Sequence, residues 1–270
     1  MSEPAALDPA SPPVRLPRPF LEWFATRGWS PRAHQLDLLA RAQDGKSVLL
    51  IAPTGAGKTL AGFLPALTDL AERPKRRPGE AHRGIHTLYI SPLKALAVDI
   101  ERNLGKPVAE MTLPIAIETR TGDTPAHKRQ RQKLAPPDIL LTTPEQLALL
   151  IASADAPRFF AGLRFVVLDE LHSLVTSKRG HLLALGLARL RRFVPSLQAI
   201  GLSATVAEPD ELRRWLVPQN PPGGLAEVIT VAGGAKPEIS ILDSRERVPW
   251  SGHSARYAIP EVYEAIRKHR

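Results

Sequence analysis

The sequence has no cysteine among its 270 residues, which excludes disulfide bonds and thiolate metal sites. Nor does it contain an apolar run near the ~20 residues that a helix needs to span a bilayer. Its N-terminus lacks the basic-then-apolar pattern of a secretory signal. We therefore expect a chain that stays in the cytoplasm.

What the sequence does have is a normal share of core-forming residues and an excess of positive charge. Hydrophobic residues make up 43% and charged residues 23%, as in soluble globular proteins. A length of 270 residues suffices for one full domain with extensions. The net charge of +9 favours an anionic partner, most simply nucleic acid, although a basic surface without a partner would give the same value.

Proline divides the chain into a tail and a folded part. Residues 1–19 contain six prolines and offer little apolar surface to bury, so we expect a disordered tail there. An apolar cluster from Phe20 should begin the domain, which we place at 20–245. Residues 246–270 should form a linker and a basic helix.

The rest of the chain is organised around an apolar run at 48–51, typical of a buried strand, followed by a loop of small residues. Gly55 and Gly57 let backbone N–H groups surround an anionic phosphate at the start of a helix. Lys58 adds a full charge for the β- and γ-phosphates, and the Thr59 hydroxyl is placed to bind Mg²⁺. The predicted nucleotide contacts in this loop are Thr54, Gly55, Ala56, Gly57, Lys58 and Thr59.

Two features near this loop need separate comment. Its first position is Ala52, where the strict phosphate-loop pattern has glycine, so we interpret the loop as a variant. Gln35 precedes the loop on a predicted helix, and its amide can both donate to and accept from an adenine edge. Taken alone, Gln35 would be an ordinary solvated residue, but its position favours adenine binding.

Strand patterns alternate with helix patterns along the chain. This order predicts an α/β fold with a mostly parallel sheet covered by helices on both faces. Ligands bind such folds at the carboxyl ends of the strands, which is where the chemically distinctive residues fall. The predicted strands are 48–51, 86–90, 115–119, 138–142, 164–168, 199–202, 227–231 and 238–242.

A pair of acids follows the most hydrophobic strand pattern. Asp169 comes directly after four apolar residues, the place for a carboxylate that holds Mg²⁺, often through water. Glu170 beside it can orient or deprotonate an attacking water. The pair could also be a polar cap on a buried strand, but with Lys58 and Thr59 upstream we favour hydrolysis.

Taken together, the motifs resemble those of superfamily 2 helicases from about Phe20 onward. Residues 52–59, 169–172 and 203–205 look like motifs I, II and III, and 91–99, 121–123 and 142–145 look like motifs Ia, Ic and Ib. Phrases at 91–99 and 176–180 are similar to the large helicase-related branch, and within it to the ligase-associated DEXH-box helicases.

The resemblance implies a RecA-like P-loop domain with a role for each motif. ATP and Mg²⁺ would be the cofactors, and Lys58, Asp169 and Glu170 the catalytic residues. His172, Ser203 and Thr205 would couple nucleotide state to strand movement. Backbone-directed contacts to single-stranded nucleic acid, DNA rather than RNA, would come from Pro92, Lys94, Thr121, Gly122, Thr143 and Pro144.

The chain also departs from the family pattern. After Thr205 it has no Gln-x-x-Gly-Arg-x-x-Arg motif, which carries the arginine finger in the family's second RecA-like domain. We therefore interpret the chain as a first motor domain whose hydrolysis is weak or absent without the second. The resemblance further implies 3′-to-5′ polarity, DNA repair with a DNA ligase and a nuclease as functional neighbours, and association with the nucleoid.

Two other functions remain open from the sequence. A module that binds nucleotide and nucleic acid without turnover would also lack the arginine finger. A P-loop kinase or nucleotide switch would share residues 52–59, but Asp169, Glu170 and the Ser203-Ala204-Thr205 segment argue against it.

Overall fold

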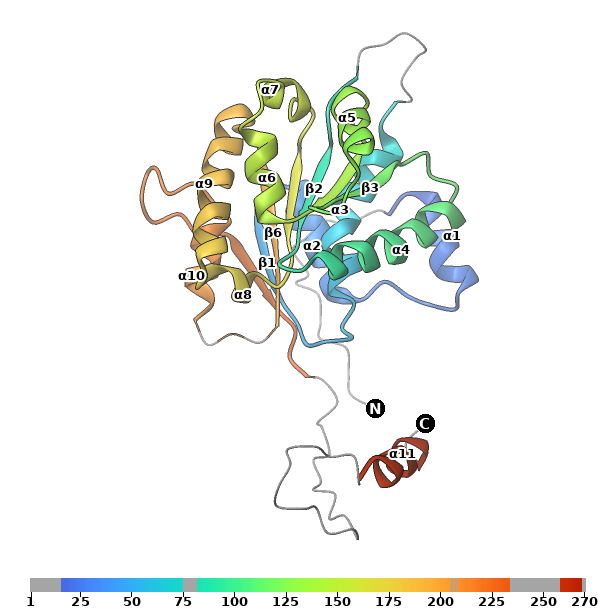
Figure 1. Cartoon of the computed structure of the whole chain (residues 1–270). Coiled ribbons are helices and arrows are strands. Elements are labelled where there is room, and N and C mark those ends of the chain that lie inside the picture. The colour runs from blue at the N-terminus through green and yellow to red at the C-terminus, as the bar shows by residue number, and fades with distance from the viewer. Residues whose placement is uncertain (1–15, 75–81, 205, 207, 234–257, 269–270) are drawn as a thin grey trace. The chain divides into compact units, whose positions relative to one another are not determined.

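The computed structural model describes residues 16–74, 82–204, 206, 208–233 and 258–268. The chain divides into two compact units, residues 1–233 and 234–270. The first unit holds the sheet and almost all of the helices that the structure describes (Figure 1). In the second unit the described part is the helix α11 (Ile259–Lys268) with residue 258.

A seven-stranded sheet in the order β3-β4-β2-β5-β6-β1-β7 forms the centre of the first unit. Every pairing between these strands is parallel, as the alternation of strand and helix patterns predicted. The strands are β1 (Val48–Ile51), β2 (Thr87–Ile90), β3 (Ile117–Arg120), β4 (Ile139–Thr142), β5 (Phe165–Leu168), β6 (Gln198–Ser203) and β7 (Glu227–Thr230). The predicted strand at 238–242 lies outside the described residues.

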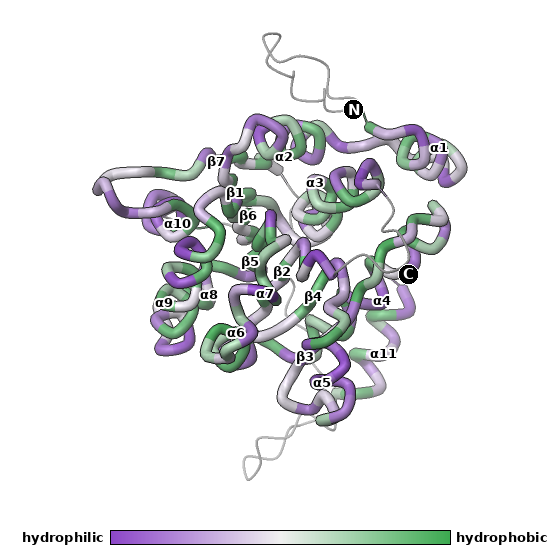
Figure 2. The backbone as a smooth tube through the Cα atoms, turned by 90° about the horizontal axis from the view of Figure 1, so that it is seen from above, coloured by the Kyte–Doolittle hydropathy of each residue, from purple (hydrophilic) through white to green (hydrophobic). Residues whose placement is uncertain are grey.

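Helices cover both faces of the sheet, because successive strand residues point to opposite sides (Figure 2). Leu50 and Ile200 face one cluster of buried side chains, whereas Leu49 and Ala199 face the other. The first cluster is covered by α1 (Arg18–Thr26), α2 (Ala33–Gln43), α3 (Lys58–Glu72) and α4 (Lys94–Glu110). The second is covered by α6 (Pro144–Ile151), α7 (Ala156–Phe159), α8 (Leu171–Val175), α9 (Lys178–Phe193) and α10 (Pro209–Trp215).

The remaining helix of this unit, α5 (Ala126–Leu134), lies beside the edge strand β3. Gln132 on α5 donates to the Glu118 carboxylate of β3 at 2.9 Å. Arg131 pairs with the same carboxylate at 2.6 Å. Arg131 and Gln132 therefore hold α5 to the edge of the sheet.

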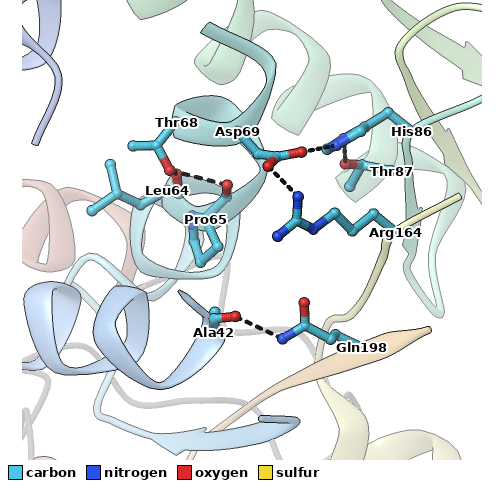
Figure 3. Close-up of polar contacts among 9 residues, drawn as sticks. All are labelled: Ala42, Leu64, Pro65, Thr68, Asp69, His86, Thr87, Arg164 and Gln198. Atoms are coloured by element: carbon cyan, nitrogen blue, oxygen red, sulfur yellow. Dashed lines mark hydrogen bonds and ion pairs between the residues drawn. The ribbon is translucent and has the colours of Figure 1, made fainter. Parts of the chain in front are cut away.

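The amino-terminal edge of the sheet is closed by polar contacts between elements (Figure 3). His86 is buried and bonds the Asp69 carboxylate of α3 at 2.6 Å, and Arg164 pairs with the same carboxylate. Although burial opposes ionisation, these two partners hold the pKa of Asp69 below its usual value. Gln198 donates to the Ala42 carbonyl at 2.8 Å, which joins β6 to α2.

Two differences from the sequence analysis concern the ends of the fold. Leu16 is buried in the first core cluster and α1 begins at Arg18, so packed structure starts before Phe20. The separation into units falls after Gly233, ahead of the predicted boundary at 245. Among the described helices, none is both long and apolar enough to cross a membrane.

Candidate functional site

The carboxyl ends of the strands bring the predicted site residues to one edge of the sheet. Since all strands run the same way, the segments that follow them emerge together. The segments after β1, β6 and β5 are neighbours and carry the predicted nucleotide residues. Those after β2, β4 and β3 are neighbours on the other side and carry the predicted nucleic-acid residues. We call these the nucleotide half and the nucleic-acid half.

The phosphate loop leads from β1 into α3 as predicted. Gly57 caps α3 with a left-handed backbone (φ +78°), which favours glycine. A Cβ atom there would also lie 3.0 Å from the Gln35 amide. The Lys58 ammonium donates to the loop's own carbonyls, Ala52 at 2.8 Å and Pro53 at 3.3 Å. Lys58 is thus folded over the loop, where a phosphate would give it a stronger partner.

Three side chains at the start of α2 contact the back of the loop through successive backbone carbonyls. The pairs are Arg32 with Gly55 at 3.0 Å, His34 with Ala56 at 2.9 Å and Gln35 with Gly57 at 3.4 Å. Because a carbonyl only accepts, Nε2 of His34 carries the hydrogen, and burial lowers the pKa of His34, which favours the neutral ring. Peptide planarity turns the N–H groups of Gly57 and Lys58 away from α2.

Gln35 has a structural role in addition to the predicted one. Only 4% of this residue is exposed, and its Oε1 accepts from the Arg32 backbone N–H at 2.9 Å. Both ends of the amide therefore have partners within the chain. To contact adenine, Gln35 would have to break these hydrogen bonds. Its role in adenine binding stays a prediction.

The acid pair after β5 divides into a buried and a half-buried carboxylate. Asp169 is 8% exposed and accepts from the Tyr89 hydroxyl at 2.5 Å and from the Glu170 N–H at 3.0 Å. Burial and the Asp169 charge raise the pKa of Tyr89 far above its usual value, so Tyr89 stays a donor. Glu170 has a left-handed backbone (φ 47°), unusual for a residue with a Cβ atom and common where function demands it.

A polar chain connects this acid pair to the end of β6. The Glu170 carboxylate lies 3.4 Å from Nε2 of His172, whose Nδ1 lies 2.9 Å from the Ser203 hydroxyl. The structure thus brings together residues that were predicted from two separate motifs, 169–172 and 203–205. Thr205, the remaining predicted coupling residue, lies outside the described residues.

The nucleic-acid half combines one exposed cation with buried side chains. Lys94 is 56% exposed and pairs with Asp123 at 3.0 Å, and a Cβ atom on Gly122 would lie 3.5 Å from its ammonium. Thr121 and Thr143 are buried, as is Pro144 at the start of α6. Such buried residues can offer a ligand backbone groups but little side chain. Half-exposed Pro92 completes the predicted set.

Some side chains at this edge were not singled out from the sequence. Tyr89 lies within a strand pattern, where an aromatic residue is ordinarily core, and Arg32 and His34 lie in a polar segment before a helix. Their contacts are tertiary, with partners such as Asp169 that lie 80 positions away. The clue that the sequence offered was proximity of Arg32 and His34 to Gln35.

ATP and Mg²⁺ fit the groups present in the nucleotide half. Mg²⁺ is typically held by one or two protein groups together with substrate phosphates. Asp169 and the half-buried Thr59 supply such a set. Lys58, which bonds only uncharged carbonyls, is available to a phosphate.

A parallel sheet with this loop after β1 and an acid pair after β5, one strand removed from β1, defines a P-loop nucleotide-binding protein. Residues 32–212 match the family model described as DEAD/DEAH box helicase. The chain belongs to the DEAD/DEAH box helicase family.

Relatives place it more narrowly. The chain is 45% identical over 211 residues to the Lhr helicase/probable uracil glycosylase of Mycolicibacterium smegmatis. The matched segment covers 74% of this chain and 14% of that protein. The chain is 41% identical over 182 residues to the ATP-dependent helicase Lhr-Core of Methanothermobacter thermautotrophicus, covering 64% and 21%. The predicted resemblance to the large helicase-related branch is confirmed.

A solved structure supports the same fold. The structure of Mycobacterium smegmatis helicase Lhr bound to ssDNA and AMP-PNP matches 94% of this chain and 32% of that one, with a TM-score of 0.71 and 36% identity. The RecA-like fold is thereby confirmed. The chain spans only 14% and 21% of the two curated relatives described above.

Proposed function

We propose that this chain is the ATP-binding motor region of a DNA helicase that couples ATP hydrolysis to movement along single-stranded DNA. The observation that carries the proposal is the link from Glu170 through His172 to Ser203, because it connects the expected hydrolytic carboxylate to a second strand end. The relatives named as helicases, and the Lhr structure described as bound to ssDNA and AMP-PNP, support it.

Each residue of the nucleotide half would have a distinct role. Lys58 and the loop N–H groups would bind the β- and γ-phosphates, and Gln35 would read adenine. Thr59 and Asp169 would hold Mg²⁺, which supplies charge neutralisation at the phosphates. Glu170 would accept the proton of the attacking water, and His172 beside it would sense the loss of the γ-phosphate.

We further propose that turnover requires a second motor domain. An arginine finger contributes about 10³–10⁵ to the rate of phosphoryl transfer, and the family resemblance assigns it to that domain. Closure of two domains on DNA would also assemble the site only when a strand is bound. An alternative is a module that binds nucleotide and nucleic acid without turnover.

Finer assignments come mainly from the family resemblance. We propose 3′-to-5′ polarity, a role in DNA repair beside a DNA ligase and a nuclease, the ligase-associated type within the family, and a location on the nucleoid in the cytoplasm. DNA is proposed over RNA on the same ground.

The test is phosphate release by the purified 270-residue chain with and without single-stranded DNA, beside nucleotide binding measured on the same sample. We expect Mg·ATP to bind, release to be slow and DNA to stimulate it little. A longer protein that includes the second domain should release phosphate in a DNA-dependent way. Rapid DNA-stimulated release by the 270-residue chain would contradict the two-domain proposal and point to an internal arginine, first of all Arg32.

A further inference from the structure

Arg179, at the start of α9, connects its own helix to two segments of the nucleic-acid half through one guanidinium group. Its Nε and Nη2 donate to the two carboxylate oxygens of Glu145, the second at 3.0 Å. Its Nη1 donates to the backbone carbonyl of Pro92, in the turn after β2. Glu145 directly follows Pro144 on α6, so Arg179 connects two of the three predicted nucleic-acid turns.

The start of α9 is itself firmly placed. Ser177 caps the helix, accepting from the Gly180 N–H at 3.1 Å and donating to the Leu174 carbonyl of α8 at 2.8 Å. A Cβ atom on Gly180 would lie 2.0 Å from the same Leu174 carbonyl, so only glycine permits this approach. Because α8 begins directly after Glu170, Arg179 is anchored to the segment that carries the hydrolytic carboxylate.

Packing behind the guanidinium group keeps α9 and α6 close together (Figure 1). A Cβ atom on Gly186 of α9 would lie 3.2 Å from Leu147 of α6. The first turns of the two helices therefore lie side by side, which places the Arg179 side chain within hydrogen-bond distance of Glu145. The hydrogen bond with Arg179 lowers the pKa of Glu145 to about 2, against the effect of burial, so the pair stays charged at neutral pH.

The chemistry of this contact favours arginine over lysine. A planar guanidinium can meet a carboxylate with two parallel bonds and still offer a third to a carbonyl at a fixed angle. An ordinary exposed ion pair contributes little to stability. A fork that ties three chain segments instead restricts their relative positions, which matters where two turns must meet the same ligand.

We propose that Arg179 is a positioning residue that holds the turn at Pro92 and the start of α6 at the separation needed to grip one nucleic-acid strand. The proposal rests on the proposed function, since it assigns the pair of turns to strand binding. The proposal also explains why an acid, Glu145, lies beside the site proposed for an anionic ligand. Acting through Arg179, Glu145 favours binding although its own charge opposes it.

This sign difference makes the proposal testable. Replacing Glu145 by Met removes a negative charge, so electrostatics alone predicts tighter binding of single-stranded DNA. If Glu145 instead acts through Arg179, the same change weakens binding. A direct contact of Arg179 with phosphate would give weaker binding for Arg179→Met but not for Glu145→Met.

The experiment measures the Kd of the 270-residue chain for a labelled single-stranded oligonucleotide of mixed sequence and, separately, for Mg·ATP. Arg179→Met and Glu145→Met are each expected to raise the Kd for DNA about tenfold, with Arg179→Lys between them and the wild type. The Kd for Mg·ATP should not change in any of them. Arg18→Met is the matched control, because it removes the same charge from an exposed pair with Glu22 and should stay within about twofold of the wild type.

Each result has a definite meaning. Glu145→Met binding DNA as tightly as the wild type, or more tightly, overturns the positioning role. Wild-type protein that binds no DNA would instead contradict the proposed function, which keeps the two failures distinct. Circular dichroism checks folding. If Arg179→Met does not fold, Arg179→Lys and Glu145→Met still show whether loss of the contact weakens or strengthens DNA binding.

Discussion

The two halves of the carboxyl edge use the same strand-end geometry but hold their functional groups differently. In the nucleotide half, Asp169 and Gln35 are buried, and the side chains of both have hydrogen-bond partners inside the chain. In the nucleic-acid half, Lys94 stands in solvent, whereas Thr121 and Thr143 are covered. Buried, fixed polar groups in the nucleotide half suit a chemical reaction, whereas the exposed charge of the nucleic-acid half suits contacts with the backbone of a polymer.

Physical chemistry explains why the two halves differ. Charges placed among fixed donors in a low-dielectric site act strongly on a developing charge, because nothing must reorganise during the reaction. A strand that must move past the protein needs contacts that form and break easily, and exposed charge pairs are individually weak. Substituting an exposed side chain that contacts the strand should therefore cost less than substituting a fixed group of the nucleotide half.

The largest difference should come from Glu170→Gln in a protein that carries both motor domains. The change keeps the shape but removes the carboxylate that we propose accepts the proton of the water, so hydrolysis should fall about 10²–10⁴-fold. ATP binding should stay nearly intact. The measurement is steady-state phosphate release together with nucleotide affinity. Turnover near the wild-type rate would show that another group activates the water.

A smaller but still large effect is expected for Lys58→Ala on binding itself. Charge-assisted contacts to phosphate are worth ~1.5–3 kcal/mol, so the Kd for Mg·ATP should rise at least about tenfold. Titration with a fluorescent ATP analogue measures it, and DNA affinity in the absence of nucleotide serves as the control. Equal ATP affinity in mutant and wild type would contradict the assignment of residues 52–59 as a phosphate loop.

How far the sequence predicted these halves depends on the range of the interactions. The strand at 48–51 and Gly57 before Lys58 were readable because they depend on local pattern and backbone geometry. The bonds of Tyr89 to Asp169 and of Arg179 to Glu145 join distant segments, and no local pattern specifies them. The sequence therefore predicted the phosphate loop and its strand, while the contacts that support the candidate site required the fold.

The border between the halves provides a third test, because Tyr89 of β2 donates to Asp169 after β5. Tyr89→Phe leaves a buried carboxylate oxygen without this donor, which should cost ~1–3 kcal/mol of unfolding free energy. Chemical denaturation measures the loss. The exposed Tyr263 on α11 gives the matched control, Tyr263→Phe, which should change nothing. A Tyr89→Phe protein as stable as the wild type would mean that the bond contributes no net stability.

The smallest effect is expected for Lys94→Ala, which tests directly whether the exposed lysine of the nucleic-acid half contacts DNA. Its ammonium lies 3.0 Å from both oxygens of Asp123, so a DNA phosphate must compete with an existing exposed pair. Such exposed pairs are worth ~0.2–1 kcal/mol, which limits the rise in the Kd for single-stranded DNA to about fivefold.

The salt dependence of Lys94→Ala carries more information than its Kd. Each phosphate contact to a single strand contributes about 0.7 to the slope of log affinity against log salt, so the loss of one contact should lower the slope by that amount. Asp123→Asn frees the same ammonium and should leave the slope unchanged or raise it. ATP affinity should stay constant in both variants, since neither residue lies in the nucleotide half. An unchanged slope in Lys94→Ala would mean that Lys94 neutralises no phosphate of the strand, and the contrast between an exposed cation in one half and buried groups in the other would then have no role in binding DNA.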